Sequence, residues 1–355
     1  MNCAVQATCG GCPLLSTQRH EELREKARMV SDALAAHGIT TPVVVDGDSE
    51  IDAGRFGYRN RLRMKVVDGC ADFFNEAKRD GCPVVRAELW AAIEEVRAVT
   101  AADPTLLAGV DHLEVRVGDL DDLGLMLSSV VDRDHLGVAL GSHWVIADAS
   151  TTASAELVVL SYRPDAASPL VEVPLNAFVQ VNSEVNRRLV THVLQLGLQT
   201  QATTFLDLYS GAGNFSVPLA AHGLRGTAIE SSRDALAALS ESGAARSGLI
   251  ECVEADLSDI AGVVRGLRPV HLVVADPPRA GFGDLTGAEA AALASLTLDT
   301  FVLIGCNVGS FARDVAALTS AGLHLESVTA FDMFPGTKHV ETLAVLRAAP
   351  ARTQP

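Results

Sequence analysis

Residues 207–215 read DLYSGAGNF, and the fold of the second half of the chain follows from this stretch. An apolar run at 204–208 leads into it as a strand, and Gly211 and Gly213 allow a tight turn at the start of a helix. A dinucleotide fingerprint has a third glycine where this chain has Ser216. Two glycines alone are weak evidence for a ligand, since an ordinary strand-to-helix turn also uses them.

Strand and helix signals alternate from about residue 169 to the end of the chain. We expect strands at 204–208, 226–229, 250–253, 271–275, 300–304 and 343–346, and helices at 217–221, 234–245 and 288–295. This alternation predicts an α/β fold with a doubly wound, Rossmann-like parallel sheet.

The first half of the chain has a different pattern. We expect helices at 16–37 and 87–99 and short strands at 58–67, 113–117, 125–131 and 143–147. The turn-rich segment 161–169 separates the two halves. The sequence therefore predicts an α+β domain at 1–168 and the doubly wound domain at 169–355, and 355 residues are enough for two cores.

The net charge of −16 argues against indiscriminate binding of nucleic acid, which depends on a basic surface that neutralises phosphates. A local contact is still open at Arg59, Arg61, Arg63 and Lys65, which recur every second residue and share one face of a strand. By pattern alone, an ordinary solvated face fits these four residues equally well.

The N-terminus reads Met1-Asn2-Cys3-Ala4, without a basic segment followed by an apolar one, and no apolar run approaches the length of a membrane span. We therefore expect a cytoplasmic protein without membrane contact, and a monomer. In a reducing compartment the seven cysteines are better read as metal ligands or catalytic thiols than as disulfides.

Acidic residues stand at four successive strand ends, namely Asp207, Glu230, Asp256 and Asp276. Ligands of open parallel sheets bind beyond the carboxyl ends of the strands, where a carboxylate can accept hydrogen bonds from ribose hydroxyls. Any one of the four fits a solvated surface. The set favours a nucleoside without phosphates, and S-adenosyl-L-methionine fits better than NAD.

A thiol lies at the same edge of the sheet, because the strand at 301–304 leads into Gly305-Cys306-Asn307. A buried cysteine is usually just a small apolar residue. Uracil C5, however, accepts a methyl group only after a nucleophile adds to C6, and a thiolate suits that step. Glu341 opens the last strand. It would be a capping or ion-paired residue without Cys306, and with Cys306 it is a candidate base.

Five motifs in order carry a resemblance to a known family. They are FVQVN at 178–182, DLYSGAGNF at 207–215, DPPRAG at 276–281, Cys306-Asn307 and HVE at 339–341. Through them the chain resembles the RNA uracil-C5 methyltransferase family over nearly its whole length, and it is most similar to the compact branch that acts on 23S ribosomal RNA. Many relatives have Ser where this chain has Gly305, which affects only the local turn.

The resemblance implies a class I methyltransferase domain at 169–355 and a role for each site residue. Cys306 is the implied nucleophile, and Glu341 is the base that removes the C5 proton. The implied S-adenosyl-L-methionine contacts are Gln180, Tyr209, Gly211, Asn214, Glu230, Asp256 and Asp276. The implied partner is structured RNA, with rRNA favoured over tRNA. The target uridine would leave its stack, with Phe178 or Phe334 as candidates for stacking on it.

The resemblance also implies a 4Fe-4S cluster in the N-terminal domain. Its ligands would be Cys3, Cys9, Cys12 and Cys82, the last followed by Pro83. Four cysteines also make a closed zinc site, and Cys70 is an alternative fourth ligand. We expect the cluster to be structural or to position RNA.

Three other functions stay open. An amino-group methyltransferase also carries an acidic residue followed by two prolines after this strand, and its chemistry needs no thiol. An RNA-binding or iron-responsive module could keep the fold without catalysis. A methyltransferase acting on a free small molecule would suit the acidic surface.

Overall fold

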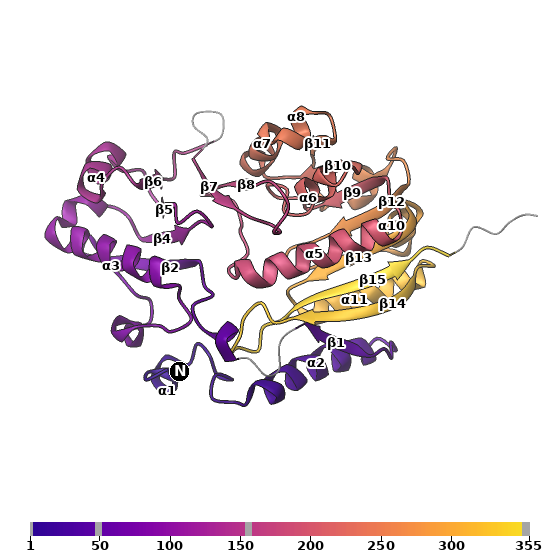
Figure 1. Ribbon diagram of the computed structural model, residues 1–355, viewed down its shortest axis with the longest axis horizontal. Helices are drawn as coiled ribbons and strands as arrows, with labels where there is room; N and C mark the ends of the chain where they lie inside the picture. The colour runs from indigo at the N-terminus through magenta and orange to yellow at the C-terminus, as the bar shows by residue number, and fades with distance from the viewer. Residues whose placement is uncertain (1–2, 47–51, 153–157, 350–355) are drawn as a thin grey trace, which may run out of the picture.

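The computed structural model describes residues 3–46, 52–152 and 158–349, and an eight-stranded mixed sheet organises much of it (Figure 1). The strand order is β1-β14-β15-β13-β12-β9-β10-β11. Only β15 is antiparallel to its neighbours. The strands are β1 (Val43–Asp46), β9 (Thr204–Leu208), β10 (Arg225–Glu230), β11 (Ile250–Glu254), β12 (Val270–Ala275), β13 (Thr297–Gly305), β14 (His324–Phe331) and β15 (Glu341–Arg347). The predicted doubly wound α/β sheet is confirmed.

The winding of this sheet creates a switch point between β9 and β12. The chain enters at β9, adds β10 and β11 on one side, and then returns to place β12 and β13 on the other. At such a point the two adjoining connections leave in opposite directions, which opens a crevice at the carboxyl ends of the strands. The predicted site residues therefore belong at the ends of β9, β10 and β12.

Helices cover both faces of the eight-stranded sheet. Buried residues of one core come from α5 (Ser183–Gln199), α6 (Ser216–Ala221) and α7 (Arg233–Glu241), with α8 (Gly243–Arg246) packed beside them. The other core includes α2 (Arg19–Ala35), α9 (Ile260–Val264), α10 (Gly287–Ser295) and α11 (Val308–Ser320). The helix predicted at 234–245 divides at Ser242, whose side chain accepts a hydrogen bond from Ala245 N and so begins α8.

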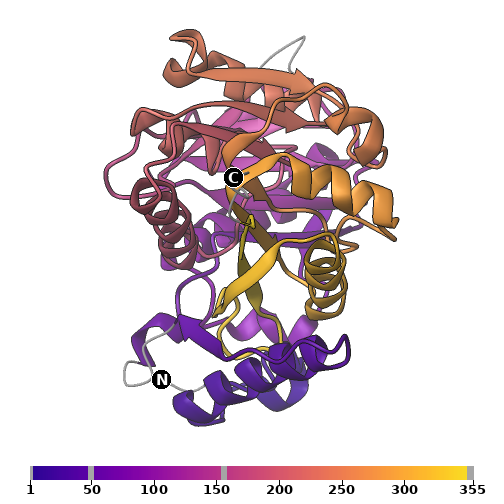
Figure 2. The ribbon, with the colours of Figure 1, turned by 90° about the vertical axis from the view of Figure 1, so that its right-hand side faces the viewer.

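The N-terminal segment joins the C-terminal sheet, which the sequence does not predict. Strand β1 pairs in parallel with β14, and Val30 and Leu34 of α2 are buried in the core beneath them. Figures 1 and 2 both place the indigo α2 and β1 beside the yellow C-terminal strands. The predicted division at residues 168 and 169 stays a prediction, and the β1 pairing crosses it.

A smaller five-stranded sheet forms the α+β unit that the sequence predicts. Its order is β3-β2-β4-β5-β6, antiparallel except between β5 and β6. Its strands are β2 (Arg61–Val67), β3 (Cys70–Asp72), β4 (His112–Val117), β5 (Leu123–Leu127) and β6 (Trp144–Ala147). Helices α3 (Ala87–Ala102) and α4 (Arg133–Leu140) contribute Leu89, Ile93 and Leu136 to its core.

The segment predicted to link the two halves is the turn of a hairpin. Strands β7 (Val159–Tyr162) and β8 (Val171–Pro174) pair antiparallel around it, and Leu160 and Val173 are buried in the core that α5 covers. The remaining short elements are α1 (Gln6–Cys9), η1 (Asp52–Arg55), η2 (Glu76–Asp80) and η3 (Pro104–Leu107). No helix in the described ranges is both long and apolar enough to cross a membrane.

Candidate active site

Three of the predicted acidic residues meet at the switch point and form what we call the carboxylate rim, Asp207, Glu230 and Asp276. Asp207 is fully buried on β9 and accepts a hydrogen bond from Ser216 Oγ at 2.5 Å. Burial raises its pKa to about 7, and the nearby charges of Asp276 and Glu230 add to the rise. Burial likewise raises the pKa of the Asp276 carboxyl to about 7. A further negative charge at the rim would therefore be unfavourable.

The glycine turn after β9 is held by the rim itself. Gly211 has a φ of 55° and Gly213 a φ of 99°, and a Cβ on Gly213 would lie 2.6 Å from the Leu239 side chain. Glu230 Oε2 accepts a hydrogen bond from Gly211 N at 2.9 Å. Tyr209 also has a positive φ, 63°, which costs energy in a residue with a side chain. The turn is a strained, tightly fitted cradle of the kind that approaches a ligand.

The FVQVN motif places Gln180 between the two sheets. Gln180 is 8% exposed, and its carbonyl oxygen accepts a hydrogen bond from Asn60 Nδ2 at 2.9 Å. One turn into α5, Asn186 exchanges side-chain hydrogen bonds of 2.8 and 3.1 Å with Asn214 of the glycine turn. Gln180 and Asn214 therefore lie on segments that meet at the same end of the sheet. Asp256 is exposed just beyond β11, close enough for its charge to raise the pKa of Tyr209.

Cys306 and Glu341 face each other across two paired strands. Gly305 of β13 is opposite Thr342 of β15, and Thr342 Oγ1 donates a 2.6 Å hydrogen bond to the Gly305 carbonyl. Cys306 follows the last residue of β13, and Glu341 is the first residue of β15, so the two residues are neighbours of this pair. Glu341 is 2% exposed, and its Oε1 has no hydrogen-bond partner among the residues that the structure describes. A buried carboxyl oxygen without a partner is available to a substrate.

The environment of Cys306 opposes ionisation of its thiol. Burial raises the pKa of its thiol to about 11, and the charges of Glu341 and Asp276 raise it further, whereas Arg279 lowers it. Burial also raises the pKa of Glu341 well above its ordinary value, and Asp276 contributes to that rise. Cys306 lies one residue before Asn307, the N-cap of α11, and the N-terminal dipole of that helix favours a thiolate.

Arg279 is a functional candidate that the sequence analysis does not single out. Its cation lies close enough to lower the pKa of the Cys306 thiol and that of His339. It belongs to the DPPRAG motif after β12, and this motif is the sequence signal that could have identified it. Its proximity to Cys306 depends on the pairing of β12 with β13, which a sequence motif does not reveal.

The four predicted cluster cysteines lie near enough to one another for their charges to interact. Burial raises the pKa of the Cys12 thiol to about 11, and Cys82, Cys9 and Cys3 are all close enough to raise it further. Cys70 is elsewhere, with its Sγ 3.7 Å from the Thr100 carbonyl oxygen. Within the described ranges, no three His, Cys, Asp or Glu side chains form a group that could hold a metal ion.

A buried ion network ties α2 to the loop that precedes Glu341. Lys26, fully buried, pairs with Asp332 and, at 3.1 Å, with Glu22. Glu22 also accepts a hydrogen bond from Gly336 N at 2.6 Å and pairs with Arg55 at 3.0 Å. Because Leu14 N bonds to the Gly336 carbonyl at 2.8 Å, the cysteine segment and this loop are fixed to each other.

The predicted basic stripe exists but is partly neutralised. Arg61, Arg63 and Lys65 point away from the core residues Leu62 and Met64. Arg61 pairs with Glu114 at 3.7 Å, and Lys65 lies 3.9 Å from Asp72. Arg61 also lies over the ring of Phe178, which is 66% exposed, at 4.9 Å from its centroid. Phe178 is thus more open to a partner than the half-buried Phe334.

The doubly wound sheet with its glycine turn and carboxylate rim has the fold of the Rossmann-like methyltransferases. A sequence model described as tRNA (Uracil-5-)-methyltransferase matches residues 169–248. The chain is similar to the RNA uracil-C5 methyltransferases over this segment and, as the relatives below indicate, over nearly its whole length.

Curated relatives match nearly the whole chain. The 23S rRNA (uracil(1939)-C(5))-methyltransferase RlmD of Dichelobacter nodosus is 28% identical over 97% of this chain and 83% of its own. RlmD of Halomonas elongata is 29% identical over 97% of this chain and 76% of its own. In fold, the chain is similar to the Pyrococcus abyssi tRNA (uracil-54, C5)-methyltransferase in complex with S-adenosyl-L-homocysteine. Its TM-score is 0.70, with 21% identity over 96% of this chain and 86% of that one.

Proposed function

We propose that this protein transfers a methyl group from S-adenosyl-L-methionine to C5 of a uridine in structured RNA, with 23S rRNA as the favoured substrate. The observation that carries the proposal is the proximity of Cys306 to the buried Glu341 at the edge of a doubly wound sheet, next to the Gly305–Thr342 strand pair. An amino-group methyltransferase has no use for this thiol. The same chemistry on tRNA is the alternative, since the family model that matches is described by tRNA.

In the proposed reaction, the Cys306 thiolate adds to C6 of the uracil, which makes C5 a nucleophilic carbon. The bound cofactor supplies the methyl group that C5 takes up. Glu341, as a carboxylate, then removes the proton from C5, and the electrons of that bond expel the thiolate from C6. The burial that raises the pKa of Glu341 makes it a stronger base once it is ionised.

The carboxylate rim and the glycine turn are the proposed cofactor site. Asp207 Oδ1 is buried and has no partner among the described residues, and the Gly213 position excludes any side chain. Both features fit a ligand packed against the turn. Gln180, Tyr209, Gly211 and Asn214 would line the site with Glu230, Asp256 and Asp276. A ligand with a positive sulfonium suits a rim of carboxylates better than a phosphate-bearing one does.

We propose a 4Fe-4S cluster on Cys3, Cys9, Cys12 and Cys82. The mutual influence of the four thiols supports the donor set, and four thiolates are the usual ligands of such a cluster. When bound, the cluster would serve as a structural cross-link in the proposed N-terminal domain, 1–168. The hydrogen bond between Leu14 and Gly336 would transmit that order to the loop before Glu341. Zinc is the rival, and metal analysis of anaerobically purified protein decides between them.

The test of the function uses RNA in which 5-fluorouridine replaces uridine. Fluorine at C5 is not removable as a proton, so the reaction stops at a methylated adduct linked to Cys306. We expect 23S rRNA fragments and the cofactor to give an adduct that survives a denaturing gel, and Cys306→Ala to give none. Cys252→Ala, which removes a half-buried thiol on β11, is the matched control and should retain the adduct.

Other outcomes separate the alternatives. An adduct with tRNA but not with rRNA would move the substrate to tRNA. Methyl transfer that persists in Cys306→Ala would indicate amino-group methylation. Cofactor binding without transfer to any RNA would support a non-catalytic module, and transfer to a free nucleoside would contradict the RNA assignment.

A further inference from the structure

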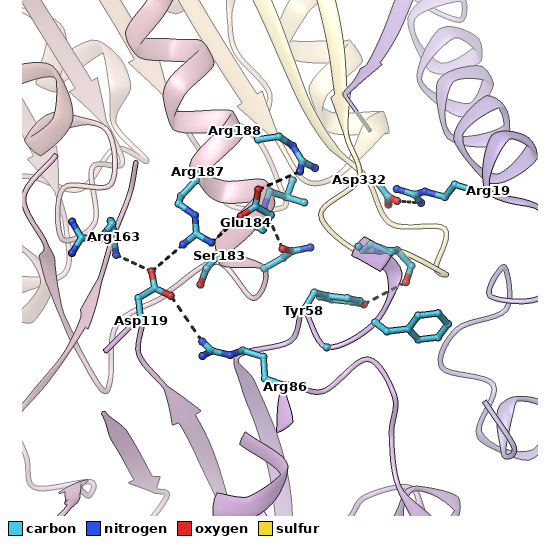
Figure 3. Close-up of a pocket in the computed structure, with 16 residues that line it drawn as sticks. Arg19, Tyr58, Arg86, Asp119, Arg163, Ser183, Glu184, Arg187, Arg188 and Asp332 are labelled. Atoms are coloured by element: carbon cyan, nitrogen blue, oxygen red, sulfur yellow. Dashed lines mark hydrogen bonds and ion pairs between the residues drawn. The ribbon is translucent and has the colours of Figure 1, made fainter. Parts of the chain in front are cut away.

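A cavity of about 630 Å³ opens at the start of α5, between the two sheets, and the residues that line it come from several distant segments. Figure 3 shows them converging from α2, the β4–β5 connection, the β7–β8 hairpin and α5. We call this cavity the arginine pocket, because five of its lining residues are arginines, namely Arg19, Arg86, Arg163, Arg187 and Arg188. Its volume is within the range of small-ligand sites.

The arginine pocket differs in charge from the rest of the chain. Its five arginines are accompanied by three carboxylates, those of Asp119, Glu184 and Asp332. Asp332 is fully buried and already paired with Lys26 and Arg19. The lining residues carry five positive and three negative charges, although the whole chain has a net charge of −16. Arg86 and Arg188 also pair with carboxylates outside the lining, Asp121 at 3.0 Å and Asp46 at 2.7 Å. A cation of the lining that is left without a carboxylate attracts an anion.

Asp119 holds the arginines in position. It pairs with Arg187 at 3.4 Å and with Arg86 at 3.9 Å, and it accepts a hydrogen bond from Arg163 N at 2.8 Å. In Figure 3, Arg163, Arg187 and Arg86 surround this one carboxylate. The fixed guanidinium groups lose little freedom when an anion binds, which favours binding.

Arg163 is the pocket arginine whose guanidinium group has no acceptor among the described residues. Its side chain has no ion pair or hydrogen bond within the part of the chain that the structure describes, and it is half-buried. A guanidinium has five N–H donors in a planar fork that matches the oxygens of a phosphate. An anion that reaches Arg163 would supply the missing acceptors.

The arginine pocket and the active site share the start of α5. Asn182 caps this helix, lines the pocket and donates a 3.3 Å hydrogen bond to the Met333 carbonyl in the loop before Glu341. One turn later, Asn186 is bonded to Asn214 of the glycine turn. A strand of RNA with its target base near Cys306 therefore has its flanking backbone within reach of the pocket.

We propose that the arginine pocket binds phosphodiester groups of the RNA strand next to the target uridine. This inference rests on the proposed function, because RNA methylation identifies the anion as a nucleic-acid backbone. The pocket explains how an acidic protein binds RNA, since attraction is confined to one cavity instead of a basic surface. Sequence selection would then come from contacts to the bases.

The test is the salt dependence of binding to a fluorescein-labelled, single-stranded oligouridylate. We expect Arg163→Ala to weaken binding about fivefold and to reduce the slope of log K against log salt by about 0.7, the value for one phosphate contact on a single strand. Because Arg163 has no described ion partner, this change leaves the Asp119 network intact. Arg163→Lys, which keeps the charge, should retain most of the slope. The matched control is Arg246→Ala, because Arg246 is an exposed arginine that pairs with Glu241 on the α7–α8 segment. This variant should change neither the affinity nor the salt slope.

Binding of S-adenosyl-L-methionine is measured on the same proteins as a check of folding, and it should be equal in all. An unchanged slope in Arg163→Ala would overturn the inference. Uridine monophosphate or inorganic phosphate that binds as tightly as the oligouridylate would overturn the assignment to a strand, and so would equal binding of an acidic peptide.

If the fluorouridine adduct fails to form but Arg163→Ala still lowers the slope, the proposed reaction is wrong and the pocket stands. If the adduct forms and Arg163→Ala leaves the KM for RNA unchanged, the reaction stands and the pocket does not.

Discussion

The carboxylate rim and the arginine pocket lie on two sides of the first turns of α5, and they have opposite charge. The rim collects Asp207, Glu230 and Asp276, and the burial of two of these carboxyls raises their pKa to about 7. The arginine pocket instead collects five guanidinium groups around Asp119. The protein thus separates a site suited to a cationic cofactor from a site suited to an anionic strand. Net charge alone would suggest that it avoids RNA.

The largest expected effect tests Glu341, whose buried carboxyl lies near Asp276 of the rim. Glu341→Gln removes the base but leaves Cys306, so the thiolate still adds and the methyl group still transfers. We expect turnover to fall about 10³–10⁴-fold and a methylated covalent adduct to accumulate on ordinary RNA. Glu326→Gln, at the far end of β14 and paired there with Arg347, is the control and should keep full turnover. A loss of turnover without any adduct would remove Glu341 from the role of base.

The second prediction concerns the wall of the arginine pocket. Lys26→Met leaves Asp332 and Glu22 buried with less compensation, and we expect a loss of about 3–5 kcal/mol in the free energy of unfolding. Arg28→Met removes the cation of a 3.6 Å pair with Asp32 in which both side chains are at least 67% exposed. This substitution should lower the free energy of unfolding by less than about 0.5 kcal/mol. A denaturant titration of both variants measures the two losses. Equal costs would show that the buried network does not hold α2 to the loop.

The third prediction tests the middle of the rim. Glu230→Gln keeps the shape of the side chain but removes the charge that accepts hydrogen bonds from Gly211 N and Ser232 N. We expect the Kd for S-adenosyl-L-methionine to rise about 10–100-fold by calorimetry, since a charged hydrogen bond contributes about 1.5–3 kcal/mol. Glu254→Gln, at the exposed end of β11 and paired with Arg233, should leave the Kd unchanged. Equal Kd values for both variants would place the cofactor elsewhere.

The fourth prediction follows from the burial of Asp207. Because its folded pKa is raised from 3.8 to about 7, its contribution to stability is present at pH below 4 and is lost as pH rises through 7. Asp207→Asn keeps an acceptor for Ser216 and should match the wild type at low pH. Above pH 7 it should be more stable by about 1–3 kcal/mol, measured by thermal melting across pH. A difference that does not vary with pH would mean that the carboxyl does not titrate in the folded state.

The smallest expected effect concerns Arg279. Its cation lowers the pKa of the Cys306 thiol, so Arg279→Gln should move the ascending limb of the pH–rate profile, which follows the thiolate, to higher pH. Near neutral pH the rate of adduct formation should fall about tenfold or less, because less thiolate is present. Arg279→Lys keeps the charge and should keep the profile. An unshifted profile in Arg279→Gln would show that the arginine does not influence the thiol.

Much of the fold is readable from local sequence. The strand ends carrying Glu230, Asp276 and Cys306 are each marked by an apolar run followed by turn residues, and the structure places all three at one edge of the sheet. The helix predicted at 16–37 is confirmed as α2, beginning three residues later at Arg19. By contrast, β1 is only four residues long, and its place beside β14 depends on a partner almost three hundred residues away.

The sequence by itself determined the doubly wound sheet and the residue types that meet at its edge. Both depend on short-range patterns, apolar runs of strand length and glycines where the chain must turn. Only the tertiary structure decided that Glu341 lies near Cys306, that Cys70 lies beside Thr100 and away from Cys12, and that five arginines share one cavity. These contacts join residues far apart in the chain, and their formation depends on the register of paired strands and on packing between the two sheets. No local pattern carries that information.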